Sequence, residues 1–288
     1  MGWLSSYKEC TMEREPTEQP VPTGGPLATK EPWNIVADAY TADLLPWAEH
    51  FARAALRLAS LPPSPSIVDV AAGPGTLALL AARDGATVSA IDFSEVMVAN
   101  LRRRANELGL AIADVRVGDG QDLPFDDNAF DGAFSMVGLI FFPDRAAGFR
   151  ELHRVLRPGR RAVVSSIASI TGPFALVLDG IHALLPSLPI AGGKMPLSDP
   201  EEFTREMSAA GFREVTIHTV THLVTTPSLT EFWRITQRSA APLALLRRKL
   251  GEERWVEVAN GVFDQLHETL GAGPVEELYT MHLGVGVK

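Results

Sequence analysis

A glycine-rich turn is the first stretch of this sequence whose residue types and spacing suit ligand chemistry. The stretch DVAAGPGTLAL runs from Asp69 to Leu79 and places the turn between two apolar runs. Glycine has no Cβ, so the backbone of such a turn can touch a ligand directly. The spacing Gly73-x-Gly75-x-x-Ala78 fits the fingerprint of a nucleotide-cofactor loop and leaves the kind of cofactor open.

Carboxylates near the turn narrow the choice of cofactor. Asp92 ends a predicted strand, where it can accept hydrogen bonds from a ribose diol, and Asp119 in the stretch GDGQDLPF can accept one from an adenine amine. The backbone of Gly120 and Gln121 lies alongside in the sequence. These features suit NAD and S-adenosylmethionine alike, because both contain adenosine. Asp69 favours S-adenosylmethionine, since a carboxylate there repels a pyrophosphate but attracts an ammonium and a sulfonium.

Alternating strands and helices must position these residues. Short apolar runs predict strands, and amphipathic runs between them predict helices. The predicted strands are 66–72, 87–92, 112–120, 130–138 and 161–168, and the predicted helices are 76–85, 94–109 and 146–159. Such alternation implies an α/β fold in which a parallel sheet has helices on both faces. Ligands of such sheets bind beyond the carboxyl ends of the strands.

The flanking segments break this alternation. A polar, Pro- and Gly-rich segment predicts a flexible tail, and 31–288 is expected to be a single domain. Its remaining predicted parts are cap helices over 31–61 broken near Pro46, an apolar insert over about 169–197, a helix over 198–212, a strand over 213–224, an insert of two or three helices over about 226–272 and a last strand over 274–288. The tail is predicted to cover residues 1–30.

The run from Ile67 to Ser166 resembles the core of class I S-adenosylmethionine-dependent methyltransferases. It is most similar to their small-molecule branch, which includes the ubiquinone and menaquinone C-methyltransferases and is also described as methyltransferase type 11-like. The resemblance implies a Rossmann-like sheet of seven strands whose last strand is antiparallel, a strand that VEELYTMHLGVGVK would supply. The family motif D-x-G-x-G-x-G is matched by Asp69, Ala71, Gly73 and Gly75, with Ala71 in place of the first glycine.

The resemblance also implies a cofactor, S-adenosyl-L-methionine. No metal is expected, because the sequence does not offer the oxygen ligands from several loops that magnesium would need. The turn would meet the methionyl end of the cofactor, Asp92 the ribose and Asp119 the adenine amine. Further expected cofactor contacts are Tyr40, Phe93, Met97, Gly120, Gln121 and Met136. Many relatives have a His-His pair where Ile140 and Phe141 stand here, so a histidine role at that position is lost.

The predicted inserts and the cap supply candidates for the side of the site that holds the methyl acceptor. His182 lies in the first insert and is the candidate general base, because histidine is the commonest choice for that role. Candidate lining residues of the substrate pocket are Trp33, Val137, Phe174, Leu178, Met195 and Trp233. Inserts rich in Leu, Pro and Trp suggest an aromatic or lipophilic small molecule.

Composition excludes several other classes of partner. The chain has 288 residues and a formal net charge of −9, which disfavours nucleic acid as the partner. Its only cysteine is Cys10, so we expect no disulfide framework, no thiolate metal site and a cytoplasmic setting. No apolar run approaches the roughly 20 residues that span a bilayer. MGWLSS fits a myristoylation pattern, but nothing basic follows, so no stable membrane anchoring is expected.

The sequence therefore predicts an enzyme that transfers a methyl group to an oxygen, nitrogen or carbon atom of a small molecule, as a monomer or homodimer. A biosynthetic role is expected by resemblance. One alternative is a non-catalytic partner subunit that keeps the fold; the intact set of carboxylates and glycines argues against it. The other is an NAD-dependent oxidoreductase, whose phosphate contacts conflict with Asp69.

Overall fold

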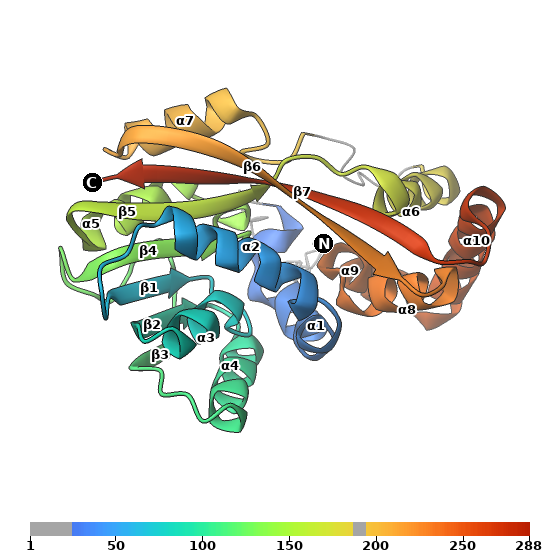
Figure 1. Ribbon diagram of the computed structural model, residues 1–288. Coiled ribbons are helices and arrows are strands. Elements are labelled where there is room, and N and C mark those ends of the chain that lie inside the picture. The colour runs from blue at the N-terminus through green and yellow to red at the C-terminus, as the bar shows by residue number, and fades with distance from the viewer. Residues whose placement is uncertain (1–24, 187–193) are drawn as a thin grey trace, which may run out of the picture.

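The structure is a computed structural model that describes residues 25–186 and 194–288. Its described residues form one seven-stranded sheet in the order β3-β2-β1-β4-β5-β7-β6 (Figure 1). The strands are β1 (Ser66–Val70), β2 (Thr87–Asp92), β3 (Asp114–Val117), β4 (Phe130–Met136), β5 (Leu156–Ile167), β6 (Arg213–Thr226) and β7 (Val275–Val287). β7 runs antiparallel to both β5 and β6, whereas the strands from β3 to β5 pair in parallel. The predicted fold is thus confirmed.

Helices cover both faces of this sheet. The helices are α1 (Lys30–Asp43), α2 (Leu45–Leu58), α3 (Thr76–Arg83), α4 (Glu95–Glu107), α5 (Arg145–Val155), α6 (Gly172–Leu184), α7 (Pro200–Ala209), α8 (Leu229–Ser239), α9 (Ala241–Leu250) and α10 (Glu252–Leu270), with short 3-10 helices η1 (Pro26–Ala28) and η2 (Leu139–Phe141). On one face α2 and α3 pack around Ile67 and Leu283, and on the other α5 and α7 pack around Val68 and Val70. Period-two alternation along β1 places these side chains on opposite faces.

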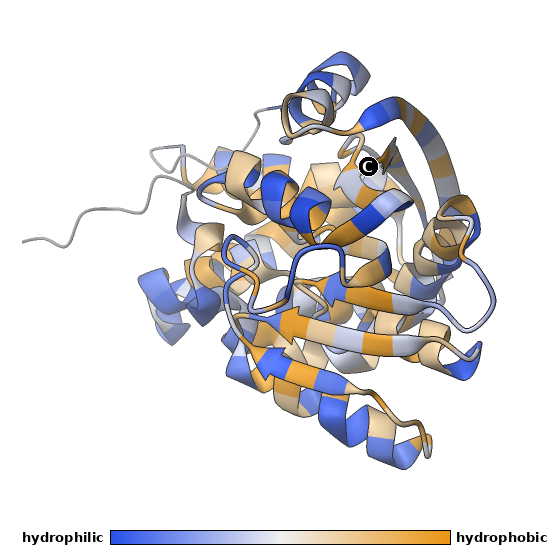
Figure 2. Ribbon diagram, turned by 90° about the vertical axis from the view of Figure 1, so that its left-hand side faces the viewer, coloured by the Kyte–Doolittle hydropathy of each residue, from blue (hydrophilic) through white to orange (hydrophobic). Residues whose placement is uncertain are grey.

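Hydropathy follows the same layers. Figure 2 shows largely apolar strands between helices that carry hydrophilic residues on their outer sides. Strands buried on both faces are expected to be nearly continuous apolar runs, and β1 and β4 fit that expectation because almost all of their residues are buried. The sheet is therefore a rigid support for the loops at its carboxyl edge.

The second half of the chain builds a helical body beyond that edge. β6 and β7 continue as a two-stranded ribbon past the end of β5, toward α8 and α10 (Figure 1). There α6, α8, α9 and α10 share an apolar cluster that contains Trp233 and Trp255. In the part of the chain that the structure describes, no helix is long and apolar enough to cross a membrane.

The structure refines several predicted boundaries. The helix predicted to reach residue 159 ends at Val155, and β5 begins at Leu156 instead of residue 161, because proline at position 158 disfavours helical backbone at Arg157. Residues 1–24 of the predicted tail, and 187–193 of the first insert, lie outside the described residues. The folded region begins before residue 31, since Trp33 Nε1 donates a hydrogen bond of 2.9 Å to the Leu27 carbonyl.

Candidate active site

The turn after β1 has the backbone that its sequence predicts. Ala71, Gly73 and Gly75 adopt φ values of 55°, 54° and 82°, in the left-handed region that favours glycine. A Cβ on Gly75 would lie 2.6 Å from Leu101 Cγ, so glycine lets α4 approach the turn. A Cβ on Gly73 would meet nothing within 4 Å. Gly73 therefore presents open backbone to a ligand.

Ala71 occupies the first glycine position of the motif at a conformational cost. A left-handed backbone costs a residue with a Cβ roughly 1–2 kcal/mol. The Ala71 methyl lies where a Cβ on Gly138 would overlap with it, in the loop that follows β4. Gly138 thus makes room for the methyl group, and two loops of the carboxyl edge meet at this contact.

Asp69 lies at the end of β1, beneath the turn. It is 1% exposed, and its Oδ2 accepts a hydrogen bond of 3.1 Å from Ala78 N in the first turn of α3. Its Oδ1 is buried and has no partner among the described residues. Burial raises the pKa of Asp69 to about 7, against the lowering effect of the Ala78 hydrogen bond, and the Asp92 carboxylate adds to the increase. The site thus has an unpaired buried acceptor that a cationic donor could satisfy.

Asp92 ties the turn to the end of β2. Its Oδ2 accepts from Gly73 N at 2.7 Å, and its Oδ1 accepts from Ser94 N at 2.9 Å. Burial raises its pKa to about 6, although both backbone hydrogen bonds lower it. Tyr40 of α1 lies close by: its burial, together with the Asp92 charge, raises the pKa of Tyr40 to about 12.

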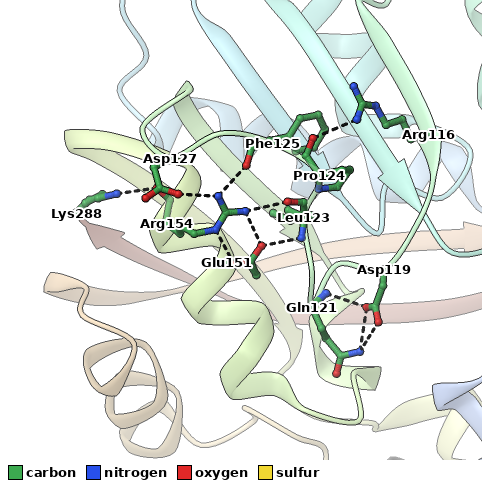
Figure 3. A network of polar contacts seen from close by, with 10 residues as sticks. All are labelled: Arg116, Asp119, Gln121, Leu123, Pro124, Phe125, Asp127, Glu151, Arg154 and Lys288. Carbon is green, nitrogen blue, oxygen red and sulfur yellow. Dashed lines mark hydrogen bonds and ion pairs between the residues drawn. The ribbon is translucent and has the colours of Figure 1, made fainter.

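The loop after β3 carries the residues expected at the adenine. Asp119 Oδ1 accepts from the backbone and side-chain nitrogens of Gln121, at 2.8 and 3.0 Å (Figure 3). Asp119 is exposed, and Gly120 is buried. Arg154 of α5 donates to the carbonyls of Leu123 and Phe125, and so holds the end of this loop against the sheet.

α1 covers the carboxyl edge over the turn. The Trp33 and Phe141 rings lie 5.0 Å apart, which brings α1 onto the segment after β4. Ser94 Oγ donates to Asn34 Oδ1 at 2.5 Å, which fastens α1 to the start of α4. Met97 of α4 is buried in the apolar cluster that includes Trp33 and Tyr40. These predicted residues therefore meet around one helix.

The end of β4 lies between the two sides of the site. Phe93 and Met136 are both half-buried, at the ends of β2 and β4. Val137 has φ 59°, an outlier for a β-branched residue that costs about 1–3 kcal/mol. Its N–H donates to Ser165 Oγ at 2.8 Å, and this bond helps to fix the strained backbone.

The structure gathers only some of the residues predicted for the acceptor side. Phe174 and Leu178 are half-buried on α6, and Phe174 N donates to Glu277 of β7. Met195 packs against the cluster of α5 and α7. Trp233 lies in the core of the helical body and lines an open hollow of about 400 Å³, whose lining includes no residue of the turn or its carboxylates.

His182 does not have the surroundings expected of a base. It lies in the last turn of α6 and is exposed, whereas the Asp69 and Asp92 carboxylates are buried. Histidine at a helix C-terminus also has a purely local explanation, because its charge is favourable there. Among residues 25–186 and 194–288, no group of three or more His, Cys, Asp or Glu side chains could hold a metal ion.

Sequence reasoning missed the residues that act through distant contacts. Arg154 could have been suspected from the stretch HRVLRPG, since an arginine before a tight turn can reach loop carbonyls. Glu277 and Tyr279 lie on the last strand, and Trp47 lies on α2. No local pattern indicated them, because their partners are far away in the sequence.

The comparisons with known proteins agree with this geometry. A family described as "Methyltransferase domain" matches residues 68–164, from β1 to β5. A demethylmenaquinone methyltransferase of Corynebacterium kroppenstedtii is 38% identical over 143 residues, which cover 49% of this chain and 58% of that protein. A ubiquinone/menaquinone biosynthesis C-methyltransferase, UbiE, of Geotalea daltonii is 30% identical over 188 residues, 59% of this chain and 79% of that protein. The chain spans about half the length of several other curated relatives that it matches.

A solved structure extends the comparison to the fold. The [4+2]-cyclase SpnF aligns with a TM-score of 0.56 at 19% sequence identity, over 93% of this chain and 98% of that one. Sheet order, antiparallel β7 and the glycine turn define the class as the Rossmann-like methyltransferase fold. The chain belongs to the class I S-adenosylmethionine-dependent methyltransferases, in the branch that contains the ubiquinone and menaquinone C-methyltransferases.

Proposed function

We propose that the protein transfers a methyl group from S-adenosylmethionine to an oxygen, nitrogen or carbon atom of an aromatic or lipophilic small molecule, in a biosynthetic role. The observation that carries the proposal is the unpaired, buried Oδ1 of Asp69 beside the open backbone of Gly73. The ammonium group of a methionyl ligand would satisfy that oxygen, whereas a pyrophosphate would be repelled by it.

The residues of this chain would bind and orient the cofactor. Asp69 would hold the ammonium group, Asp92 the ribose hydroxyls and Asp119 the adenine amine. When bound, S-adenosylmethionine supplies a methyl group that its sulfonium already makes electrophilic. The protein therefore has to align the acceptor and exclude water, and α1 with Tyr40 covers the site for that purpose. Proximity and orientation can lower a barrier by roughly 7–11 kcal/mol at the extreme.

Relatives and side chains both support an aromatic acceptor. Curated relatives are named as demethylmenaquinone methyltransferases, and the quinone ring of such a substrate is planar and apolar. The Trp33 and Phe141 rings pack against each other at the carboxyl edge, and Phe174 lies in the first turn of α6. Aromatic rings favour one another in offset or tilted arrangements at centroid distances of about 4.5–7 Å.

Two other functions remain to be tested against this one. The fold is shared with a protein named as a [4+2]-cyclase, so the fold by itself does not imply methyl transfer. A non-catalytic partner subunit would keep the fold and need not bind the cofactor. A nicotinamide oxidoreductase would need pyrophosphate contacts at the turn, which Asp69 opposes.

Calorimetric titration separates these possibilities. We expect S-adenosylmethionine and its demethylated product to bind with Kd values on the order of 10 μM, about −7 kcal/mol, and NADH not to bind. Binding of NADH alone would move the proposal to the oxidoreductase. If neither S-adenosylmethionine nor its demethylated product binds, the non-catalytic partner subunit is favoured. Gel filtration of the same samples tests the expected monomer or homodimer, and a nucleic-acid binding assay tests the expected absence of that partner.

A further inference from the structure

The first residues of β7 project beyond the sheet at its carboxyl edge. The last residue of β5 that pairs with β7 is Ile167, opposite Met281, so residues 275–280 have only β6 as a strand neighbour. Side chains alternate along this segment: Glu277 faces inward and is buried, whereas Glu276 faces outward and is exposed. The inward face of this segment lies at the edge where ligands of α/β sheets bind.

Glu277 is a buried carboxylate with one oxygen in use. It is 5% exposed, and its Oε2 accepts a hydrogen bond of 3.0 Å from Phe174 N in the first turn of α6. Its Oε1 has no hydrogen-bond partner among the described residues and, unlike Asp69 Oδ1, is not sealed from solvent. Its Oε1 is therefore free to accept a hydrogen bond from a ligand that reaches it.

Aromatic packing joins the strand that carries Glu277 to α2. Tyr279, two residues along β7 and on the same face, stacks on Trp47 of α2 with ring centroids 4.6 Å apart. Burial raises the pKa of Tyr279, with further increases from Glu277 and Tyr40. Burial and, after it, the charge of Asp92 raise the pKa of Tyr40. Tyr40 thus connects Tyr279 to Asp92 electrostatically, and the contact with Trp47 fixes the position of Tyr279.

We propose that Glu277 is a catalytic residue that accepts the proton of a hydroxyl group on an aromatic methyl acceptor. In this step the O–H bond of the acceptor breaks, a new O–H bond forms at Glu277 Oε1, and the electron pair stays on the acceptor oxygen. The proton later passes from Glu277 to solvent. This role deepens the proposed function and rests on it, and it replaces His182 as the candidate base.

The environment of Glu277 suits proton transfer near neutral pH. Burial raises its pKa to about 7, although the hydrogen bond from Phe174 lowers it. The ideal pKa of a general base lies close to the working pH. The groups that face it are the N-terminus of α6, whose dipole favours the charged form, and Tyr279 on its own strand.

A fluorescent hydroxyl probe tests the role without a known substrate. Excited 2-naphthol releases its proton to a neighbouring base and then emits as the naphtholate. Full-length protein saturated with S-adenosylhomocysteine is titrated with 2-naphthol, and 2-methoxynaphthalene serves as the probe without a proton. Glu277→Gln keeps an oxygen that can accept from Phe174 N, and Glu276→Gln is the matched control on the outward face.

The proposal expects naphtholate emission from the bound probe in wild type and in Glu276→Gln, and loss of that emission in Glu277→Gln, which still binds both probes. Wild-type emission should also disappear as the pH falls through about 7, which needs no variant. Unchanged emission in Glu277→Gln, equal loss in Glu276→Gln or no binding of 2-naphthol overturns the role of Glu277. The proposed function stands in those cases if S-adenosylhomocysteine binds, and fails if it does not.

Discussion

The two sides of the carboxyl edge are built in different ways. On the cofactor side, short loops are held by backbone hydrogen bonds between nearby residues: Ala78 and Asp69 are 9 positions apart, and Gly73 and Asp92 are 19 apart. On the proposed acceptor side, Phe174 and Glu277 meet across 103 positions.

Packing completes the acceptor side. The Trp47 ring stacks on Tyr279, and beside it His50 stacks on His222 at 4.3 Å, so one face of α2 binds two neighbouring strands. Side chains of this kind can change without altering the backbone, whereas the loops of the cofactor side depend on their exact hydrogen bonds. We infer that the cofactor side fixes the reaction class and that the proposed acceptor side determines which molecule is methylated.

Asp92→Ala is expected to have the largest effect and to be confined to the cofactor side. It removes two hydrogen bonds to a charged acceptor, each worth about 1.5–3 kcal/mol, and with them the anchor of Gly73. Affinity for S-adenosylmethionine should fall by about 100-fold, measured by calorimetry. The exposed Asp84→Ala is the control, and Glu277→Gln should leave this affinity unchanged. An effect of less than about threefold would remove Asp92 from the cofactor site.

Gly138→Ala is expected to destabilise the contact between the loops after β1 and β4. The new methyl overlaps with that of Ala71, and overpacking of this kind costs typically 1–3 kcal/mol, so we expect about 2 kcal/mol in the free energy of unfolding by urea. Ala71→Gly in the same chain should restore most of that loss, because it removes the overlapping methyl. If the two changes are simply additive, the loops do not meet as described.

Protonation of Asp69 should weaken cofactor binding in acid. Its pKa is about 7, so at about pH 6 roughly nine-tenths of the free protein carries a neutral Asp69, and affinity for the cationic cofactor should fall about tenfold from its value at about pH 8. Calorimetry between about pH 6 and about pH 8 measures the slope of cofactor affinity against pH. Asp69→Asn should bind more weakly and flatten it; a wild-type affinity that does not change with pH would refute the assignment.

Protonation of Asp69 has the opposite effect on the stability of the free protein. A carboxylate whose pKa is raised by folding binds more protons in the native state than in the unfolded state. Stability is therefore greatest below the unfolded pKa near 4 and is lost as the pH rises toward about 7. Asp69→Asn should remove this contribution, so the free variant gains stability over wild type at neutral pH while it loses cofactor affinity.

The backbone of the turn could be predicted from the sequence because its contacts are local. Asp69, Gly73 and Asp92 lie in one strand–turn–helix–strand unit, and the positive φ of each glycine follows from that turn. The parallel sheet with helices on both faces followed from alternation, and its seven strands with the last one antiparallel followed from the resemblance, whereas the order of the strands came only from the structure. By contrast, His182 was chosen for its residue type within an apolar insert, and type alone does not determine which way a helix faces.

The acceptor side could not be predicted, because its geometry depends on where distant segments dock. Glu277 is one of many acidic residues in the sequence, and only the register of β7 and the position of α6 make it a buried carboxylate. Trp233 belongs to an amphipathic helix and packs in the helical core. The sequence could not indicate which apolar surface this side chain would join.

Ala71→Gly alone should have the smallest effect and is the finest test of the comparison. The change relieves the strain of a left-handed backbone at φ 55° but raises the conformational entropy of the unfolded chain. At such positions the net effect favours glycine by about 0.5–1 kcal/mol in the free energy of unfolding. The neighbouring Ala72→Gly, at a position without positive φ, should instead destabilise by a similar amount. If both changes destabilise equally, the Ala71 methyl gains more from its contact with Gly138 than its backbone loses. Packing would then stabilise the cofactor side as it does the acceptor side, and the distinction between the two would be one of degree.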